Sequence, residues 1–134
     1  MNNLLSKIED LEKFITLWEL ESSTISKGTV GWHIEHSLLT LNVIIEAMKN
    51  SNDREYKYCF KLPKWYVLTF GKIPRGRAEA PKVVQPNQNF DQQTLTEHIK
   101  KSKVNVSALK SLKKNNYFNH PYFGMINLKP SIKY

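Results

Sequence analysis

The stretch from Thr29 to Ser51 constrains the fold of this chain most, because apolar residues cover most of its circumference when it is drawn as a helix. At about 100° per residue, two apolar faces flank one narrow polar arc. The first face is formed by Ile34, Leu38, Leu41, Ile45 and Met48, the second by Trp32, Leu39, Val43 and Ala47, and the arc by Glu35, Asn42, Glu46 and Lys49. Such a helix is typical of the centre of a bundle. We therefore expect a central helix over residues 29–51 that begins at Thr29.

Three further segments have helical patterns. Residues 3–20 carry apolar side chains at alternating spacings of four and three, and residues 62–70 begin with Pro63 in a first turn and precede Gly71. Residues 91–114 begin with Asp91, a favourable N-cap. Their inner stripe is formed by Leu95, Ile99, Ser102, Val106, Leu109 and Leu112. The pattern predicts an all-α chain that forms a single domain over residues 1–134.

The connections between these helices read as irregular. Residues 72–90 contain three prolines and a glycine, which predicts a long loop. Residues 117–124 form an aromatic-rich turn, and residues 128–134 resemble the beginning of another helix. We find no internal repeat in the sequence.

Composition narrows the class of protein. The chain has 134 residues, of which 40% are hydrophobic and 24% charged, values that are ordinary for a globular domain. No apolar run reaches the roughly 18–20 residues of a membrane span, and we find no secretory signal. The single cysteine, Cys59, excludes an internal disulfide and favours a reducing compartment. We therefore expect a cytoplasmic protein with no membrane partner.

The net charge of +8 is unevenly distributed. Residues 1–50 hold four of the twenty basic residues, and no acidic residue follows Glu97. A basic half indicates either an anionic partner such as nucleic acid or a lysine-rich solvated surface. We favour the solvated surface over nucleic-acid binding.

His33 and His36 are the candidate metal ligands. A spacing of three places them on adjacent turns of the 29–51 helix, and both lie away from the polar arc. Imidazoles at this spacing can ligate Zn, Ni or Fe, although packed core histidines show the same pattern. Glu35 lies on the polar arc, so we do not interpret it as a general base.

Two other features offer alternatives. The basic loop over residues 72–77 follows Trp65, Tyr66 and Phe70, and lysine and arginine interleaved with aromatic rings can bind anionic ligands. Cys59 has lysine neighbours that could lower the pKa of its thiol, but between two aromatic residues it reads better as a small buried hydrophobe.

Three stretches in order resemble one family: residues 31–37 (GWHIEHS), residues 71–82 (GKIPRGRA followed by APK) and residues 119–124 (NHPYFG). They are similar to an uncharacterised branch of the DinB/YfiT-like superfamily of metalloenzymes. The resemblance implies an up-and-down four-helix bundle, often a homodimer, that binds a divalent metal through one histidine on the second helix and two on the last. Relatives include thiol-dependent transferases and metal-dependent hydrolases.

The resemblance assigns His36 as the second-helix ligand, because it stands four residues after Trp32 in the W-x-x-x-H pattern. It leaves His33 as a supporting or structural residue and His120 as the histidine of an HPxFG turn. The chain departs from the family after Tyr134, where members carry a helix with an HxxxH-like pair. We expect a truncated last helix, an incomplete metal site and an exposed apolar patch around His36 and Val43.

The expected function is therefore that of a divalent-metal-dependent hydrolase or transferase whose substrate the sequence does not name. The metal would be absent if the missing ligands are not supplied. The alternative is a non-catalytic helical bundle that binds a partner or an anionic ligand through the 72–77 loop.

Overall fold

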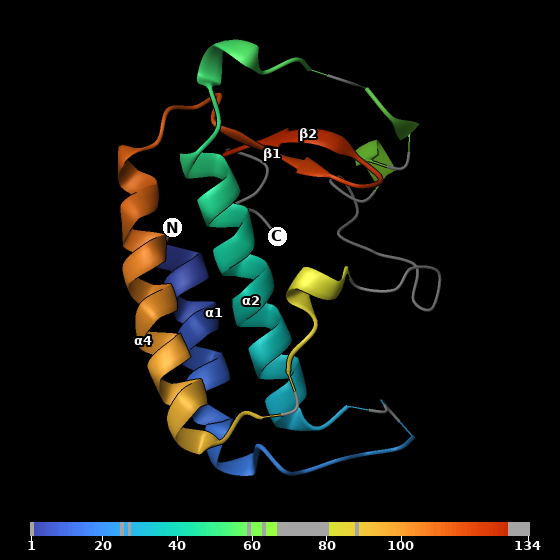
Figure 1. Ribbon diagram of the computed structural model, residues 1–134, viewed down its shortest axis with the longest axis vertical. Coiled ribbons are helices and arrows are strands. Elements are labelled where there is room, and N and C mark those ends of the chain that lie inside the picture. Colours follow the sequence, from blue (N-terminus) through green and yellow to red (C-terminus); the bar gives the residue numbers. More distant parts are fainter. Residues whose placement is uncertain are drawn as a thin grey trace. The chain divides into compact units, whose positions relative to one another are not determined.

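The computed structural model describes residues 2–24, 26, 28–58, 60–62, 64–66, 81–87 and 89–128. The described chain is mostly helical and ends in a small β-hairpin (Figure 1). Its elements are α1 (Asn2–Lys13), the 3₁₀ turn η1 (Ile15–Leu17), α2 (Val30–Lys49), η2 (Asp53–Glu55), η3 (Lys82–Val84), α4 (Gln92–Ala108), η4 (Leu109–Ser111), β1 (Tyr117–His120) and β2 (Gly124–Asn127).

The chain divides into two compact units. Unit 1 comprises Met1–Val43 and Ala80–Leu109, and unit 2 comprises Ile44–Glu79 and Lys110–Tyr134. The division falls inside α2, which is one continuous helix. The expectation of a single domain stays a prediction.

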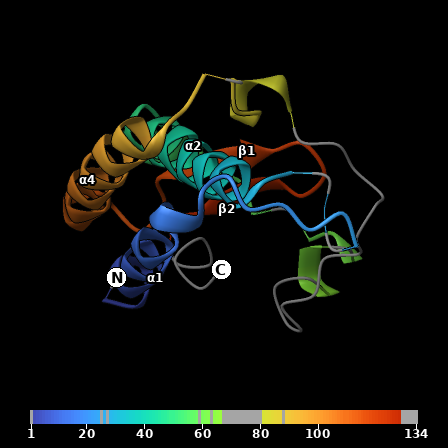
Figure 2. The same cartoon turned by 90° about the horizontal axis from the view of Figure 1, so that it is seen from below.

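Unit 1 is a packed set of helices. Here α4 lies beside α1 and beside the Val30–Val43 part of α2, and Figure 2 shows the three helices nearly end-on. Its core is apolar and is formed by Ile8, Ile15, Ile34, Leu38, Val84, Leu95, Ile99, Val106 and Leu109. Removing such a side chain from water stabilises the fold by about 1.5–3 kcal/mol. The predicted inner faces of α2 and α4 are thus confirmed in this unit.

The first helix is shorter than predicted. It ends at Lys13, and the chain continues through η1 with hydrogen bonds between residues three apart. The carbonyls of Trp18 and Leu20 accept the backbone N–H groups of Gly31 and Val30, both at 2.8 Å. Both carbonyls therefore accept hydrogen bonds from the first residues of α2 and do not take part in an extension of α1. An ion pair of 2.6 Å between Lys103 and Glu12 also joins α4 to α1.

The N-terminus of α4 is capped as predicted. The Asp91 carboxylate accepts the Thr94 N–H at 2.7 Å, and the Thr94 hydroxyl accepts the Asp91 N–H at 2.8 Å. This capping box lowers the pKa of the Asp91 carboxyl, first through the Thr94 backbone hydrogen bond. At the other end the α-helix stops at Ala108 and continues as η4, so the predicted extension to Lys114 is wrong.

Unit 2 contains the end of α2, the η2 turn and the hairpin. In the hairpin, Tyr117 pairs with Asn127 and His120 pairs with Gly124 in antiparallel register. Gly124 has a φ of +69°, a conformation that glycine adopts without strain. The all-α expectation is therefore wrong for residues 117–127: two strands flank the predicted aromatic turn, which is confined to residues 121–123. Ile45, Met48 and Ile126 form the apolar interior of this unit.

Two predicted helices lie largely outside the described residues. Residues 62 and 64–66 are helical, and residues 67–70 of the same predicted segment are not described. Residue 128 is helical, and the rest of the predicted helix over residues 128–134 is not described. Within the described ranges, no helix is both long and apolar enough to cross a lipid bilayer.

Candidate functional site

The first two turns of α2, which carry both candidate ligands, are anchored within unit 1. The first two N–H groups of this helix are bound by carbonyls of the preceding segment, and the Trp32 N–H donates to Thr29 Oγ1 at 3.1 Å. Thr29 thus acts as the predicted N-cap. A helix end whose N–H groups have partners does not fray, so the histidines of these two turns have a defined position.

His36 is half-buried and has a fixed hydrogen-bonding direction. Its Nδ1 lies 2.6 Å from the carbonyl oxygen of Val84, a residue of η3. A carbonyl oxygen can only accept, so Nδ1 carries the proton and donates. The Trp32 ring stacks on the imidazole with centroids 5.1 Å apart and an interplanar angle of 14°. In the neutral form, the lone pair is therefore on Nε2.

His33 has a different environment. It is exposed, its Nε2 lies 2.8 Å from Ser26 Oγ, and it meets the edge of the Trp32 ring. The prediction that both histidines avoid solvent is therefore wrong for His33. A helical wheel gives the direction of a side chain but not what covers it. In the first turn of α2, His33 lies beside the loop that contains Ser26.

The residues present do not complete a metal site. Among the described residues, no three His, Cys, Asp or Glu side chains come close enough together to hold a metal ion. A zinc site needs about three or four protein ligands. His36 is oriented so that its Nε2 lone pair can bind a metal. The described part of the chain therefore supplies one metal ligand and not a complete metal site.

A second polar cluster lies between α2 and α4 and was missed by sequence reasoning. Glu35 Oε2 lies 2.8 Å from His98 Nδ1, and both side chains are mostly buried. Asn42 Nδ2 lies 2.9 Å from both His98 Nε2 and Ser102 Oγ, while Asn105 Nδ2 donates to Asn42 Oδ1 at 2.8 Å. The prediction that Glu35 faces solvent is wrong.

The hydrogen-bond directions in this cluster are mutually consistent. A carboxylate only accepts, so His98 Nδ1 donates to Glu35, and His98 Nε2 then accepts from the Asn42 amide. Ser102 completes the cluster by donating from Oγ to the His98 carbonyl at 2.8 Å. Both imidazole nitrogens are used, so His98 offers no donor atom to a metal in this arrangement.

A sequence signal for this cluster exists. On α4 the polar residues His98, Ser102 and Asn105 follow spacings of four and three, and on α2 Glu35 and Asn42 are seven residues apart. Both patterns place the side chains on one helix face. Only their match across two helices identifies the cluster, and that requires knowing which helices pack together.

His120 lies in the hairpin of unit 2. Its Nδ1 accepts the backbone N–H groups of Tyr122 at 3.2 Å and Phe123 at 3.3 Å, and the Phe123 ring stacks on it at 4.4 Å. Burial lowers the pKa of this imidazole. The residue thus holds the HPxFG turn together in its neutral form.

Two remaining candidates lie outside the described residues, namely the basic 72–77 loop and Cys59. Their roles stay predictions. Comparison with known proteins gave no match to this chain among family models, curated proteins or solved structures.

Proposed function

We propose that this chain is a divalent-metal protein of the DinB/YfiT-like type, in which His36 supplies one imidazole ligand and the metal supports hydrolysis or group transfer. The ordered resemblance of residues 25–134 supports this proposal. The three packed helices are compatible with an up-and-down four-helix bundle. The fourth helix of such a bundle is not among the described elements.

One observation carries the proposal: His36 Nδ1 donates to the Val84 carbonyl. Metal-binding histidines commonly donate their second ring N–H to a carbonyl or carboxylate, which orients the ring and fixes the tautomer. Stacking on Trp32 further restricts ring rotation. Nε2 of His36 is the atom that would bind the metal.

The remaining ligands would come from residues that are not described or from a second copy in a homodimer. Zn, Ni and Fe are the metals that imidazole ligands suit best. The described residues do not hold the metal by themselves.

The proposal is tested by metal binding to the whole chain. The purified protein, freed of metal by chelation, is titrated with Zn²⁺ or Co²⁺, and bound metal is measured after gel filtration. We expect stoichiometric metal in the wild type and its loss in His36→Ala. His33→Ala is the matched control, because it removes an exposed imidazole one turn away, and it should retain the metal.

Two results would contradict the proposal. One is a wild-type chain that binds neither metal at any protein concentration, including concentrations at which it forms dimers. The other is equal loss of metal from His36→Ala and His33→Ala. Circular dichroism of each variant shows whether the helices remain folded, so that loss of the ligand is distinguished from loss of the fold.

A further inference from the structure

The net positive charge of this protein comes from one of its two units. Unit 2 contains thirteen lysine and arginine residues against four acidic residues, a net charge of +9. Unit 1 contains seven basic residues against eight acidic residues, a net charge of −1. Unit 2 also holds eleven of the fifteen Phe, Trp and Tyr residues. Basic and aromatic residues are thus concentrated together.

Within unit 2, two distant segments form one surface. The backbone N–H of Lys57 donates to Met125 Sδ at 3.4 Å, and Lys61 Nζ donates to the Tyr122 carbonyl at 3.5 Å. Lys64 Nζ donates to the Met125 carbonyl at 2.7 Å. These contacts hold the segment around Lys61 (green in Figure 1) against the hairpin (red).

This surface displays large apolar side chains to solvent. Tyr58 is 74% exposed and Tyr122 is 60% exposed. The exposed apolar residues of the two segments are Tyr58, Phe60, Leu62, Trp65, Tyr66 and Tyr122. A scattered exposed ring is ordinary, but a concentration of this kind marks an interaction site. We call it the Tyr58–Tyr122 surface.

The chemistry of its partner follows from the charges. Lys57 and Lys61 are exposed beside the rings. Three carboxylates lie in the described part of unit 2. Glu46 and Asp53 form ion pairs with Lys49 and Lys113, which belong to neither segment of the surface. Glu55 accepts a hydrogen bond from the Asn52 amide at 2.9 Å. The Tyr58–Tyr122 surface therefore presents ammonium groups to an anionic partner.

The Tyr58 ring is also supported from within the protein. Lys64 is buried, with only 5% of its surface exposed, and its Nζ lies 5.5 Å from the centroid of the Tyr58 ring. A cation near the ring attracts it and restricts its motion. A pre-oriented ring loses less conformational entropy on stacking, which favours a planar ligand.

Exposed rings beside ammonium groups are what single-stranded nucleic acid requires. Each base offers a face for stacking, and each phosphate offers a charge. In a duplex the bases are stacked inside the helix, so a duplex offers fewer base faces on which aromatic side chains can stack. We propose that unit 2 binds single-stranded DNA or RNA over the Tyr58–Tyr122 surface, with Tyr58 and Tyr122 stacking on bases and Lys57 and Lys61 contacting phosphates. This inference is independent of the metal site proposed for unit 1.

The test is fluorescence anisotropy of the whole chain with labelled oligothymidylate or oligouridylate of about 20 nucleotides. We expect binding that weakens between about 50 and 200 mM salt and is tighter than binding to a duplex of the same length. Tyr58→Ala and Tyr122→Ala should each weaken it by at least about fivefold, the loss of one stacked base. Tyr58→Phe should retain it, because the stacking face remains.

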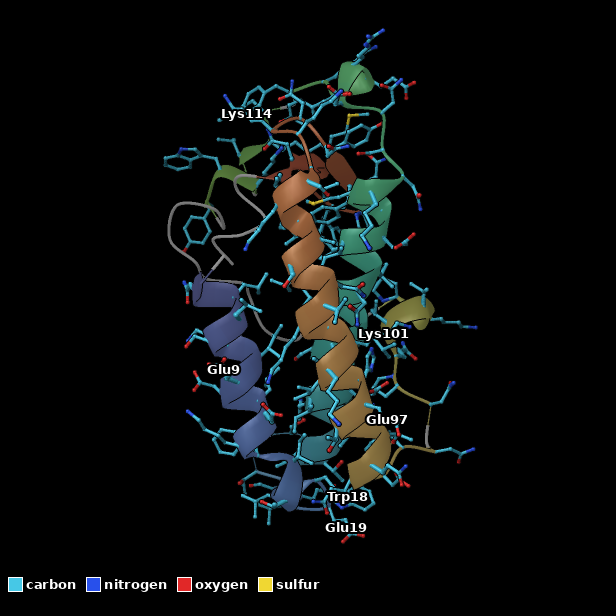
Figure 3. All side chains as sticks on the ribbon, turned by 90° about the vertical axis from the view of Figure 1, so that its left-hand side faces the viewer. Glu9, Trp18, Glu19, Glu97, Lys101 and Lys114 are labelled. Atoms are coloured by element: carbon cyan, nitrogen blue, oxygen red, sulfur yellow. The ribbon has the colours of Figure 1, made fainter. Side chains whose placement is uncertain are left out.

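Charge-matched variants separate the surface from net charge. The double substitution Lys57→Ala with Lys61→Ala should weaken binding and reduce the log–log salt slope by about 1.4, or about 0.7 per phosphate contact. Lys100→Ala with Lys101→Ala removes the same charge from exposed positions of α4 in unit 1, where Figure 3 shows Lys101 on the outer side of the helix. This pair should change little.

Several results would overturn the proposal: no binding of either oligonucleotide, equal losses from the two lysine pairs, or unchanged binding by both tyrosine-to-alanine variants. Heparin is a polyanion without bases, so at equal charge it should displace the labelled oligonucleotide less well than unlabelled oligonucleotide does. Equally strong displacement by heparin would indicate simple charge attraction and would contradict stacking on bases. Binding to phosphatidylserine vesicles without oligonucleotide binding would replace the proposal with a membrane surface. Circular dichroism melting shows that the variants are folded.

Discussion

Glu35 and His98 face each other across α2 and α4, with 2.8 Å between Glu35 Oε2 and His98 Nδ1. Side-chain exposure is 17% for Glu35 and 16% for His98, so the pair lies largely out of water. A buried polar pair of this kind contributes to pairing specificity, because sliding one helix along the other would leave both groups without partners. Asn42 and Ser102 extend the same constraint along the two helices.

Replacing Glu35 by alanine should destabilise unit 1 by about 1–3 kcal/mol, because the His98 N–H loses its acceptor in a partly buried site. The measurement is urea-induced unfolding followed by circular dichroism. In a double-mutant cycle with His98→Ala, we expect a coupling energy of about 0.5–3 kcal/mol. Glu97→Ala serves as control, since Glu97 lies on the exposed side of α4 (Figure 3). Additive single effects would show that the two side chains do not interact.

Replacing Gly31 by alanine should destabilise the protein, although alanine normally favours a helix by about 1 kcal/mol. A Cβ at this position would lie 2.7 Å from Cε2 of Phe90 and 2.9 Å from the backbone oxygen of Trp18. Backbone cannot move aside as a flexible side chain can, so we expect a cost of about 1–3 kcal/mol in thermal or urea unfolding.

Gly28→Ala is the comparison for this position. There the three atoms nearest to the added Cβ all belong to the Trp32 side chain, at 3.1–3.3 Å. We expect a smaller effect than at Gly31. A stabilised Gly31→Ala protein would show that the segment around Trp18 does not pack on the start of α2 as described.

The buried positions of the helices could be predicted from the sequence, because they depend on local periodicity. The buried positions Ile34, Leu38, Leu95 and Ile99 follow from the helical pattern, since one apolar stripe must find a partner. The Glu35 environment did not follow, because a polar residue on a helical wheel looks solvated until its partner on another helix is known. The two chain segments that form it are 63 residues apart.

The hairpin was missed for a related reason. Residues 117–127 show no clear alternation of apolar and polar side chains, so their pattern does not indicate strands. The strands are organised instead by Asn116, a buried residue of unit 2. Its Nδ2 donates to the carbonyl of Met48 in the last turn of α2 at 3.1 Å and to the carbonyl of Ser51, two residues after the helix, at 3.0 Å. These are non-local bonds that no window of sequence contains.

Replacing Asn116 by alanine should therefore destabilise unit 2 by about 1–3 kcal/mol, because the carbonyls of Met48 and Ser51 lose a buried donor. Hydrogen exchange of the hairpin amides provides the measurement, and faster exchange in β1 and β2 is the expected result. Asn115→Ala is the neighbouring control at an exposed position and should exchange like the wild type. Unchanged hairpin protection in Asn116→Ala would exclude this role.

The hairpin should also loosen at acid pH. Burial holds the pKa of His120 below its ordinary value of 6.5, so the folded protein binds this proton more weakly than the unfolded chain. The contribution to stability is complete above about pH 6.5, where both states are neutral. It falls as the pH drops below that value and stops falling once the folded-state pKa has been passed. Protonated Nδ1 can no longer accept the N–H groups of Tyr122 and Phe123.

The measurement is the free energy of unfolding between about pH 8 and pH 5, compared with that of His120→Asn. Asparagine keeps an acceptor oxygen near the position of Nδ1 but does not titrate, so subtracting the two curves isolates His120 from the other histidines. We expect the wild type to lose more stability than His120→Asn as the pH falls through 6.5. Parallel curves would show that His120 is equally protonated in both states, and the turn would then need another explanation for its shape.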